Sequence, residues 1–382
     1  MSSHPDTLAG QEAWYAYEGP EQDVVLSSRV RLARNLANFP FPPCEKEDDA
    51  QRVQSLVFDS FSRMEHPDRF QAVGVNELEL RSQQLLVERG LLPECAADKR
   101  DLNAPDADIL RSYAHPLGIV VRTDGYVSCL VNGQDHVHIC SFASGLDLTS
   151  PRQRCREIDA ALQRTLQFAA SYDFGFLTTS LRDTGSGMKL SAHMLLSGLS
   201  LAQQLRSVVD DLKSKNYGVS CSFAGNMNQG SSLGAYYKIS SEQAFNGCEE
   251  DQLAEFAAAI RSVAESERKF RSEFAENKPT VLRNIVYRMF AAVKYSRFIS
   301  CSEAIDMISA LHTGCSAGLI EGITYSELNA LLYRVRNAHV DFLNRNGGFS
   351  YERDVVQDPN LIIARLRALI MQEALESAQI CA

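Results

Sequence analysis

The segment Gly118–Val131 reads GIVVRTDGYVSCLV and predicts a β-hairpin. Residues 118–122 and 126–131 are rich in β-branched and other apolar side chains, which is typical of strands. Thr123-Asp124-Gly125 separates them, and Asp-Gly readily adopts the positive φ angles of a tight turn. Further strand-like runs alternate with helical patterns on either side of the hairpin. The first part of the chain is therefore predicted to be a mixed α/β domain.

One helix of this part is predicted to begin at Ser150-Pro151, as N-cap and first helical residue, and to run at helical spacing to Tyr172. Strand signals stop at about Glu249 and only helical patterns follow. Three helix starts are marked there, two by the spacing of a capping box and one by Asp-Pro: Ser300 with Glu303, Thr324 with Glu327, and Asp358-Pro359. We therefore expect two domains, residues 1–255 and an all-helical unit of residues 256–382.

The helical unit carries three long amphipathic segments, at 281–293, 325–340 and 361–374. They have more apolar positions than so small a unit is expected to bury alone. Dimerisation through this unit is the preferred interpretation. Packing of its apolar faces back onto the first domain is the alternative.

Composition limits the class of protein. The chain has 382 residues, 45% hydrophobic and 23% charged, with a formal charge of −10. No stretch approaches the roughly 20 apolar residues of a membrane span, and the start MSSHPDTLAG lacks the pattern of a secretory signal. Ten cysteines occur without a CxxC pair, so we expect reduced thiols, no metal site and a cytoplasmic location.

The charge is unevenly distributed. Residues 259–382 contain 15 Lys and Arg against 14 Asp and Glu, so the negative charge resides in the first 258 residues. A nucleic-acid-binding protein would normally show a basic domain, and neither part is basic. Nucleic acid is therefore excluded as a partner.

Two arginines stand out in SSRVRLAR at 27–34. Arg29 and Arg31 are two residues apart on a strand-like segment, so both guanidinium groups leave the same face and could hold one polyphosphate. A solvated basic strip is the alternative interpretation of this pair.

Several blocks, taken in order, resemble the ATP:guanido phosphotransferases. They are VNGQDHVHI at 131–139, FLTTSLRDTGSGMKLSAH at 176–193, GAYYKISS at 234–241, YRMFAAVKYSRFIS at 287–300, ISALHTGCSAGLI at 308–320 and ERD at 352–354. The C-terminal blocks are similar to the bacterial protein-arginine kinase branch, and the resemblance covers about residues 24–370.

The resemblance implies a fold and an activity. The expected fold is a small helical start, a catalytic domain with an antiparallel sheet flanked by helices, and a helical C-terminal dimerisation domain. Active relatives transfer the γ-phosphoryl group of Mg-ATP to an arginine side chain and so mark proteins for a Clp-type protease. Such transfer needs alignment, positive charge around the phosphates, and carboxylates that hold the guanidinium and take its proton.

The carboxylates of the family signature Asn-Glu-Glu-Asp-His are depleted. The chain reads Asn132-Gly133-Gln134-Asp135-His136, so both glutamates are replaced, including the one that serves the family as base. The amide of Gln134 cannot accept a proton at neutral pH. Loss of a positioned base typically lowers a rate by about 10²- to 10⁴-fold. Asp135 is a candidate substitute with a shorter side chain.

The phosphate clamp of the family is also depleted. Arg29 and Arg31 match its first two arginines, but His138 and Lys189 stand where the next two are expected. The last aligns near Phe223, and no arginine lies between positions 206 and 261. We therefore expect weak or absent nucleotide binding, with Mg-ATP as the only cofactor considered and no tightly bound one.

Two recognition segments differ as well. The family's Cys-Pro-Ser/Thr-Asn loop reads Ser180-Leu181-Arg182-Asp183, which lacks the thiol but adds a carboxylate. A remodelled surface turn is the plainer interpretation of this loop. The Arg-Asp-x-x-Arg-Ala motif that reads phosphoarginine is reduced to Arg353-Asp354, followed by Gln357-Asp358. Phosphate reading is expected to be impaired.

Together these replacements predict a catalytically impaired relative that acts by binding proteins, as a homodimer or with an active relative. Two alternatives stay open. The chain could be a working protein-arginine kinase with a rebuilt site that uses Asp135 or Asp183. It could also be an adaptor that presents protein clients to a protease. A client, if any, is not identified by the sequence.

Overall fold

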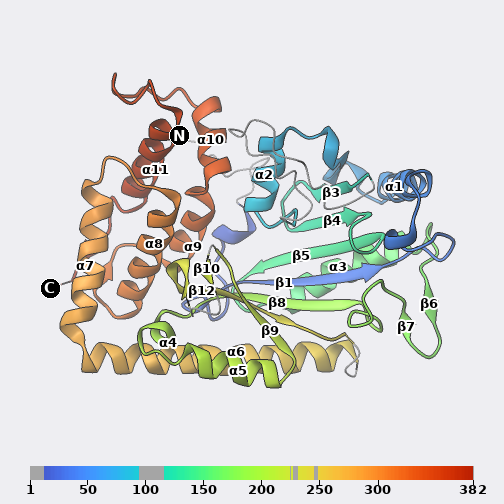
Figure 1. Ribbon diagram of the computed structural model, residues 1–382, viewed down its shortest axis with the longest axis horizontal. Coiled ribbons are helices and arrows are strands. Elements are labelled where there is room, and N and C mark those ends of the chain that lie inside the picture. The colour runs from blue at the N-terminus through green and yellow to red at the C-terminus, as the bar shows by residue number, and fades with distance from the viewer. Residues whose placement is uncertain (1–12, 94–115, 224, 227–230, 245–247, 382) are drawn as a thin grey trace.

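An eight-stranded antiparallel sheet forms the centre of the N-terminal part, and helices form the C-terminal part (Figure 1). The computed structural model describes residues 13–93, 116–223, 225–226, 231–244 and 248–381. The strands, in their order across the sheet, are β2 (Phe70–Gly74), β3 (Gly118–Arg122), β4 (Val127–Val131), β5 (Val137–Ser144), β1 (Val25–Arg34), β8 (Met188–Leu195), β12 (Tyr236–Ser241) and β9 (Tyr217–Cys221). β1 is therefore central, between β5 and β8.

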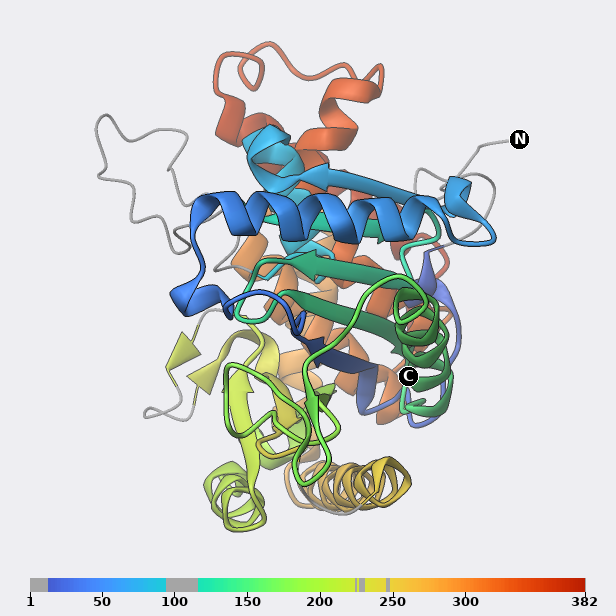
Figure 2. The ribbon, with the colours of Figure 1, turned by 90° about the vertical axis from the view of Figure 1, so that its right-hand side faces the viewer.

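Helices cover one face of this sheet. Figure 2 shows α3 beside its middle and α5 and α6 at its lower end. The helices of this part are α1 (Glu47–Ser62), α2 (Leu80–Glu88), α3 (Thr149–Leu162), α4 (Ser197–Leu201), α5 (Leu205–Ser214) and the long α6 (Glu249–Asn277). Three further strand pairs are short: β6 (Ala170–Ser171) with β7 (Gly175–Phe176), β10 (Gly225–Asn226) with β11 (Ser231–Ser232), and β13 (Ile320–Glu321) with β14 (Gln379–Ile380).

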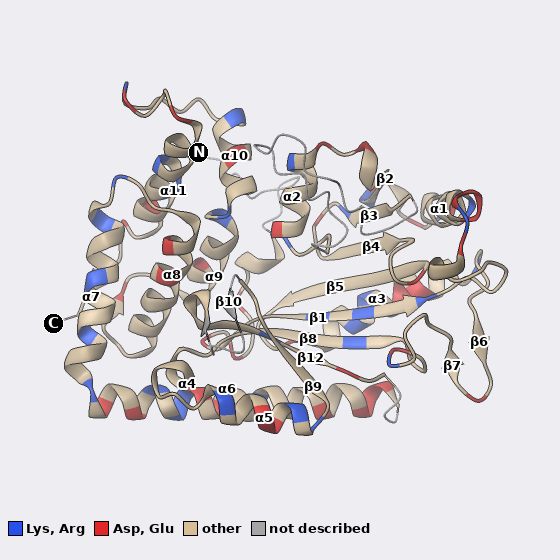
Figure 3. Cartoon of the chain, viewed as in Figure 1, with Lys and Arg blue, Asp and Glu red and all other residues tan. Residues whose placement is uncertain are grey.

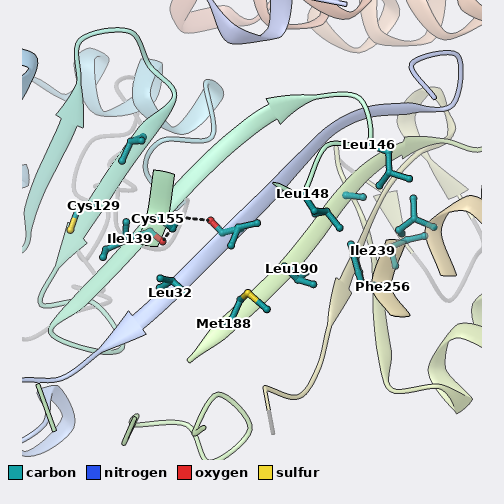
Figure 4. Packing of buried hydrophobic residues seen from close by; sticks show 14 of the residues in the cluster. Leu32, Cys129, Ile139, Leu146, Leu148, Cys155, Met188, Leu190, Ile239 and Phe256 are labelled. Carbon is teal, nitrogen blue, oxygen red and sulfur yellow. Dashed lines mark hydrogen bonds between the residues drawn. The ribbon is translucent and has the colours of Figure 1, made fainter. Parts of the chain in front are cut away.

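The alternation of side chains along the strands separates a dry face from a polar one. Leu32, Ile139 and Leu190 point into the core, where each is at most 1% exposed, and they pack with α3 and α6 (Figure 4). Burial of one such side chain contributes about 1.5–3 kcal/mol. Cys155 of α3 donates weak hydrogen bonds to the backbone oxygens of Val30 and Ile139. The opposite face of the same strands is left for polar residues.

Five helices form the C-terminal part around a second core. They are α7 (Pro279–Tyr295), α8 (Cys301–Ser316), α9 (Tyr325–Arg334), α10 (Asn337–Asn346) and α11 (Pro359–Ala374). The expected domain boundary between residues 255 and 256 falls inside α6, and the division at that position stays a prediction. Within the described residues, no helix has both the length and the apolar character of a membrane span.

Several local predictions are confirmed. The hairpin forms with Ile119 opposite Leu130, and Gly125 in its turn has φ of 73°. The capping boxes at Ser300 and Thr324 are present, since each hydroxyl accepts a hydrogen bond from the backbone of the glutamate three residues later. Asp358 likewise caps α11.

Two helix boundaries were predicted wrongly. α3 begins earlier, because the Asp147 carboxylate accepts hydrogen bonds from the amides of Thr149 and Ser150. It ends at Leu162 rather than at Tyr172. The chain after Leu162 is hydrogen-bonded to the segment that follows β1, where the Ala169 amide donates to the backbone oxygen of Asn35.

The amphipathic segment 325–340 forms two helices rather than one. α9 ends at Arg334, and α10 begins at Asn337. The carboxylate of Glu88, at the end of α2, accepts hydrogen bonds from the amides of Ala338 and His339. A contact between distant parts of the chain therefore stabilises this helix start.

Candidate functional site

The polar face of the sheet carries the residues that the sequence singled out. On β1, Arg29 and Arg31 lie on this face because the residues between and after them, Val30 and Leu32, enter the core. The register places Arg31 opposite Lys189 on β8. The prediction that the two arginines share a face is thus in agreement with the strand geometry.

A pocket of about 620 Å³ lies over this face, a volume typical of small-molecule sites. Residues 87–93 form one wall, and Leu332, Tyr333 and Arg336 of the C-terminal part form another. Five of its lining side chains are cationic and one is acidic: Arg29, Arg31, Arg89, Lys238 and Arg336, against Glu88. The pocket is therefore suited to an anion, although the first part of the chain is acidic as a whole.

Arg31 is not free in this pocket. Its Nη2 donates to Oδ2 of Asp183 at 2.5 Å, and the side chains are 14% and 7% exposed. Asp183 closes a turn in which its amide donates to the oxygen of Ser180. The altered recognition loop is thus tied to the phosphate clamp, and Ser180 lies half-buried at the start of that turn.

Asp135 is fully buried, and both of its carboxylate oxygens are occupied. Oδ1 accepts from the side chain of Asn35 and the amide of Thr179, both at 2.7 Å, and Oδ2 contacts Nε2 of His138 at 2.9 Å. Burial opposes ionisation, but the His138 bond and charge and the other hydrogen bonds outweigh it and lower the pKa of Asp135 to about 2. A carboxylate so stabilised is a weak base.

His138 occupies the position of an expected arginine but faces Asp135. Burial, followed by the charge of Arg31, lowers the pKa of His138, while Asp135 opposes that shift. At neutral pH the neutral ring therefore donates its Nε2 proton to Asp135. His136, in the same signature, is also structural, since its Nδ1 accepts from the amide of Leu36.

Gln134 is exposed on the turn between β4 and β5, next to the buried Asp135. The preceding Gly133 lies close to Leu130: a Cβ at that glycine would be 2.7 Å from the leucine Cδ2. The side chain of a glutamate at position 133, where the family signature has its first glutamate, would therefore collide with Leu130. The structure brings Gln134, Asp135, His138 and Asp183 to one end of the polar face, while Lys189 lies beside Arg31 on the neighbouring strand.

The phosphoarginine-reading remnant lies elsewhere. Arg353 and Asp354 are exposed in the turn before α11. Their neighbour Glu352 accepts hydrogen bonds from Arg297 and Arg365. Arg365, which is 7% exposed, is thus already paired with a carboxylate.

Lys238 and Arg336 were missed by the sequence reasoning. Lys238 lies on β12 opposite His193 of β8 and lines the pocket. Strict alternation along Tyr236–Ser241 could have assigned it to the polar face. Arg336 comes from the N-terminus of α10, and no local pattern places it over the sheet.

The side chains of this pocket can be compared with what binding of Mg-ATP requires. Arg29, Lys189 and Lys238 are cations on adjacent strands, as phosphate binding requires. Among the described residues, no group of three or more His, Cys, Asp and Glu side chains is placed to hold a metal ion. The residues present therefore fit the phosphates, and magnesium would be held mainly through them.

Family models match most of the chain. The model described as ATP:guanido phosphotransferase, C-terminal catalytic domain, matches residues 52–270. The chain belongs to this family. A second model, the protein-arginine kinase McsB C-terminal domain, matches residues 279–379. The family predicted from the sequence motifs is confirmed.

Curated relatives match most of this chain. A protein-arginine kinase of Pelotomaculum thermopropionicum is 29% identical over 346 residues, which are 90% of this chain and 92% of the relative. Another, of Syntrophomonas wolfei, is 28% identical over 332 residues, which are 86% and 88% of the two chains.

Solved structures show the same fold. The duplicated taurocyamine kinase of Schistosoma mansoni, with bound transition state analog components, gives a TM-score of 0.55 at 17% identity and covers 74% of this chain and 40% of its own. Lombricine kinase gives a TM-score of 0.53 at 13% identity and covers 71% and 73%. The predicted fold class, an antiparallel sheet with flanking helices, is confirmed.

Proposed function

We propose that this guanido phosphotransferase is catalytically impaired and acts by binding proteins. The observation that carries the proposal is the state of the signature turn. Gln134 provides only an amide, and Asp135 is buried with both oxygens hydrogen-bonded and a pKa of about 2. A general base works best with a pKa near the operating pH, and neither side chain meets that requirement.

The second carboxylate candidate is also engaged. Asp183 is 5% exposed and pairs with Arg31, so using it as a base would release a partly buried arginine. Removing one partner from a buried ion pair typically costs about 3–5 kcal/mol. This cost argues against Asp183 as a base that exchanges protons during turnover.

The helical C-terminal part supports a role in assembly. Val281, Tyr295 and Phe298, on and just after α7, are 48%, 82% and 42% exposed. Lys and Arg recur along the same helix (Figure 3). We propose that this surface joins two copies of the chain, or the chain and an active relative, in the cytoplasm. Light scattering of the full chain, alone and with Tyr295→Ser, tests the first arrangement, in which the variant should be monomeric.

Phosphoarginine mass spectrometry tests the impairment. The full chain is incubated with Mg-ATP and an arginine-rich protein such as casein, with an Arg29→Ala, Arg31→Ala variant as matched control. We expect no phosphoarginine above the control. Modification that vanishes in the double variant contradicts the proposal.

A second candidate is an active protein-arginine kinase with a rebuilt site, which would mark proteins for Clp-type proteolysis. The cations that line the pocket favour it, because they suit the phosphates of Mg-ATP. Nucleotide binding alone does not separate the two candidates. Phosphoarginine formation does, because only the active kinase produces it.

A further inference from the structure

Three cations from three elements converge at one end of the pocket. Arg29 belongs to β1, Lys238 to β12 and Arg336 to the start of α10. His193 lies opposite Lys238 on β8 and is close enough to interact with all three charges. Burial, followed by the charges of Lys238, Arg29 and Arg336, lowers the pKa of His193 to about 3. The convergence crosses from the sheet to the C-terminal helices.

Two of these cations have no counterion in the part of the chain that the structure describes. Within the described residues, Arg29 and Lys238 make no hydrogen bond or ion pair, and Nε of Arg29 is buried without a partner. The charge of Arg29, more than burial, lowers the pKa of Lys238 to about 8. Glu88 lines the same pocket and its charge acts on Arg336, but its oxygens already accept hydrogen bonds from the α10 amides. Such unpaired partly buried charges are unfavourable unless an anion joins them.

A separate unsatisfied donor lies at the same place. Tyr236 is 1% exposed, its hydroxyl has no hydrogen-bond partner among the described residues, and it lines the pocket. Phe223 packs beside Tyr236, and the guanidinium of Arg336 lies over the Phe223 ring, 4.9 Å from its centroid. The end of the pocket thus offers cations, a hydroxyl donor and aromatic surface together.

We propose that Lys238 and Arg336 bind the phosphates of an organic polyphosphate of the nucleoside triphosphate class, in place of the arginines this chain has lost. Lys238 is on the strand next to β9, where the last family arginine is expected near Phe223. Because Arg336 belongs to the C-terminal part, the bound anion ties α10 to the catalytic sheet. Ligand binding is then expected to stabilise the position of α10 over the sheet.

This inference deepens the proposed function, because it names the ligand and regulation of the same site, yet the two fail separately. The phosphoarginine assay tests catalysis, whereas ligand affinity tests the phosphate contacts of Lys238 and Arg336. If the chain forms no phosphoarginine and binds no polyphosphate, the proposed function stands and this inference is wrong.

Affinity measurements on the full chain test whether Lys238 and Arg336 bind phosphate. Calorimetry with Mg-ATP and, separately, inorganic tripolyphosphate compares the unaltered chain with Lys238→Gln, Arg336→Gln and the control Lys269→Gln, an exposed change on α6 that removes the same charge. We expect each pocket variant to weaken binding about tenfold to hundredfold, with the control unchanged. No binding at millimolar probe, or equal loss in the control, overturns the proposal.

Hydrogen exchange tests the coupling between the two parts. Saturating Mg-ATP should slow exchange of the α10 amides, Asn337–Asn346, in the unaltered chain. In Arg336→Gln, saturated at a higher concentration, this protection should be lost while that of β1 and β12 persists. Protection of α10 that survives in Arg336→Gln contradicts the link between the domains, and circular dichroism of the variant excludes misfolding as the cause.

Discussion

Arg31 of β1 and Asp183 of the altered recognition loop form an ion pair of 2.5 Å, although 152 residues separate them. One of the two family arginines that the chain retains is therefore neutralised by the loop that normally meets the substrate. The second, Arg29, stays unpaired among the described residues. The ion pair thus joins the 180–183 loop directly to the strand that carries both arginines.

Asp183→Asn is expected to raise nucleotide affinity. The substitution removes a negative charge from the clamp and frees Arg31 to bind phosphate, which is worth about tenfold in Kd. Titration with Mg-ATP by calorimetry measures the change. Glu242→Gln is the matched control, because it removes the same charge from an exposed pair with Arg182 nearby. Weaker binding in Asp183→Asn would show instead that the aspartate organises the clamp.

Gln134→Glu is expected to restore part of the missing chemistry. The side chain is exposed on its turn, so a carboxylate there has little effect on folding. A positioned base contributes about 10²- to 10⁴-fold to a rate, so we expect phosphoarginine formation to rise from undetectable to measurable. Gln134→Asn, which keeps an amide, is the control. Activity already present in the unaltered chain and removed by Asp135→Asn would identify Asp135 as a working base.

Several parts of the fold with a local signal were predictable. The hairpin at Gly125 and the capping boxes at Ser300 and Thr324 depend on residues a few positions apart, and all three form. The start of α10 was not predictable, because the carboxylate that caps it belongs to Glu88, 250 residues earlier. Tertiary hydrogen bonds decide such boundaries, and single-sequence patterns do not contain them.

The candidate site divides in the same way. The shared face of Arg29 and Arg31 follows from the period of a strand, and the structure places both in the pocket. The burial of Asp135 could not be read from its neighbours, since its partners Asn35 and Thr179 come from distant segments. The sequence therefore identified part of the site, without Lys238 and Arg336, and it gave neither the protonation nor the pairing of the residues that it did identify.

Asp135→Asn is expected to destabilise the fold at neutral pH by about 2 kcal/mol. The pKa of Asp135 falls from 3.8 to about 2 in the native state, so its ionised form adds stability above pH 4. That contribution is lost as the pH falls through about 4 to 2. Urea unfolding at neutral and acidic pH measures it, and the variant should be less sensitive to acid. Asp173→Asn, an exposed change, serves as control and should match the unaltered chain.

Polyphosphate affinity is expected to fall as the pH rises through 8. The groups that face Lys238 and set its charge are Arg29, Lys189, Arg31 and Cys140, with His193 opposite it. Because the pKa of Lys238 is about 8 and a bound anion stabilises its ammonium form, deprotonation removes one phosphate contact. Calorimetry with Mg-ATP between about pH 7.5 and 9.5 measures the slope, since the terminal phosphate of this probe is already fully ionised there. Lys238→Gln should flatten the profile, and a slope that persists in this variant would assign the titration to another group.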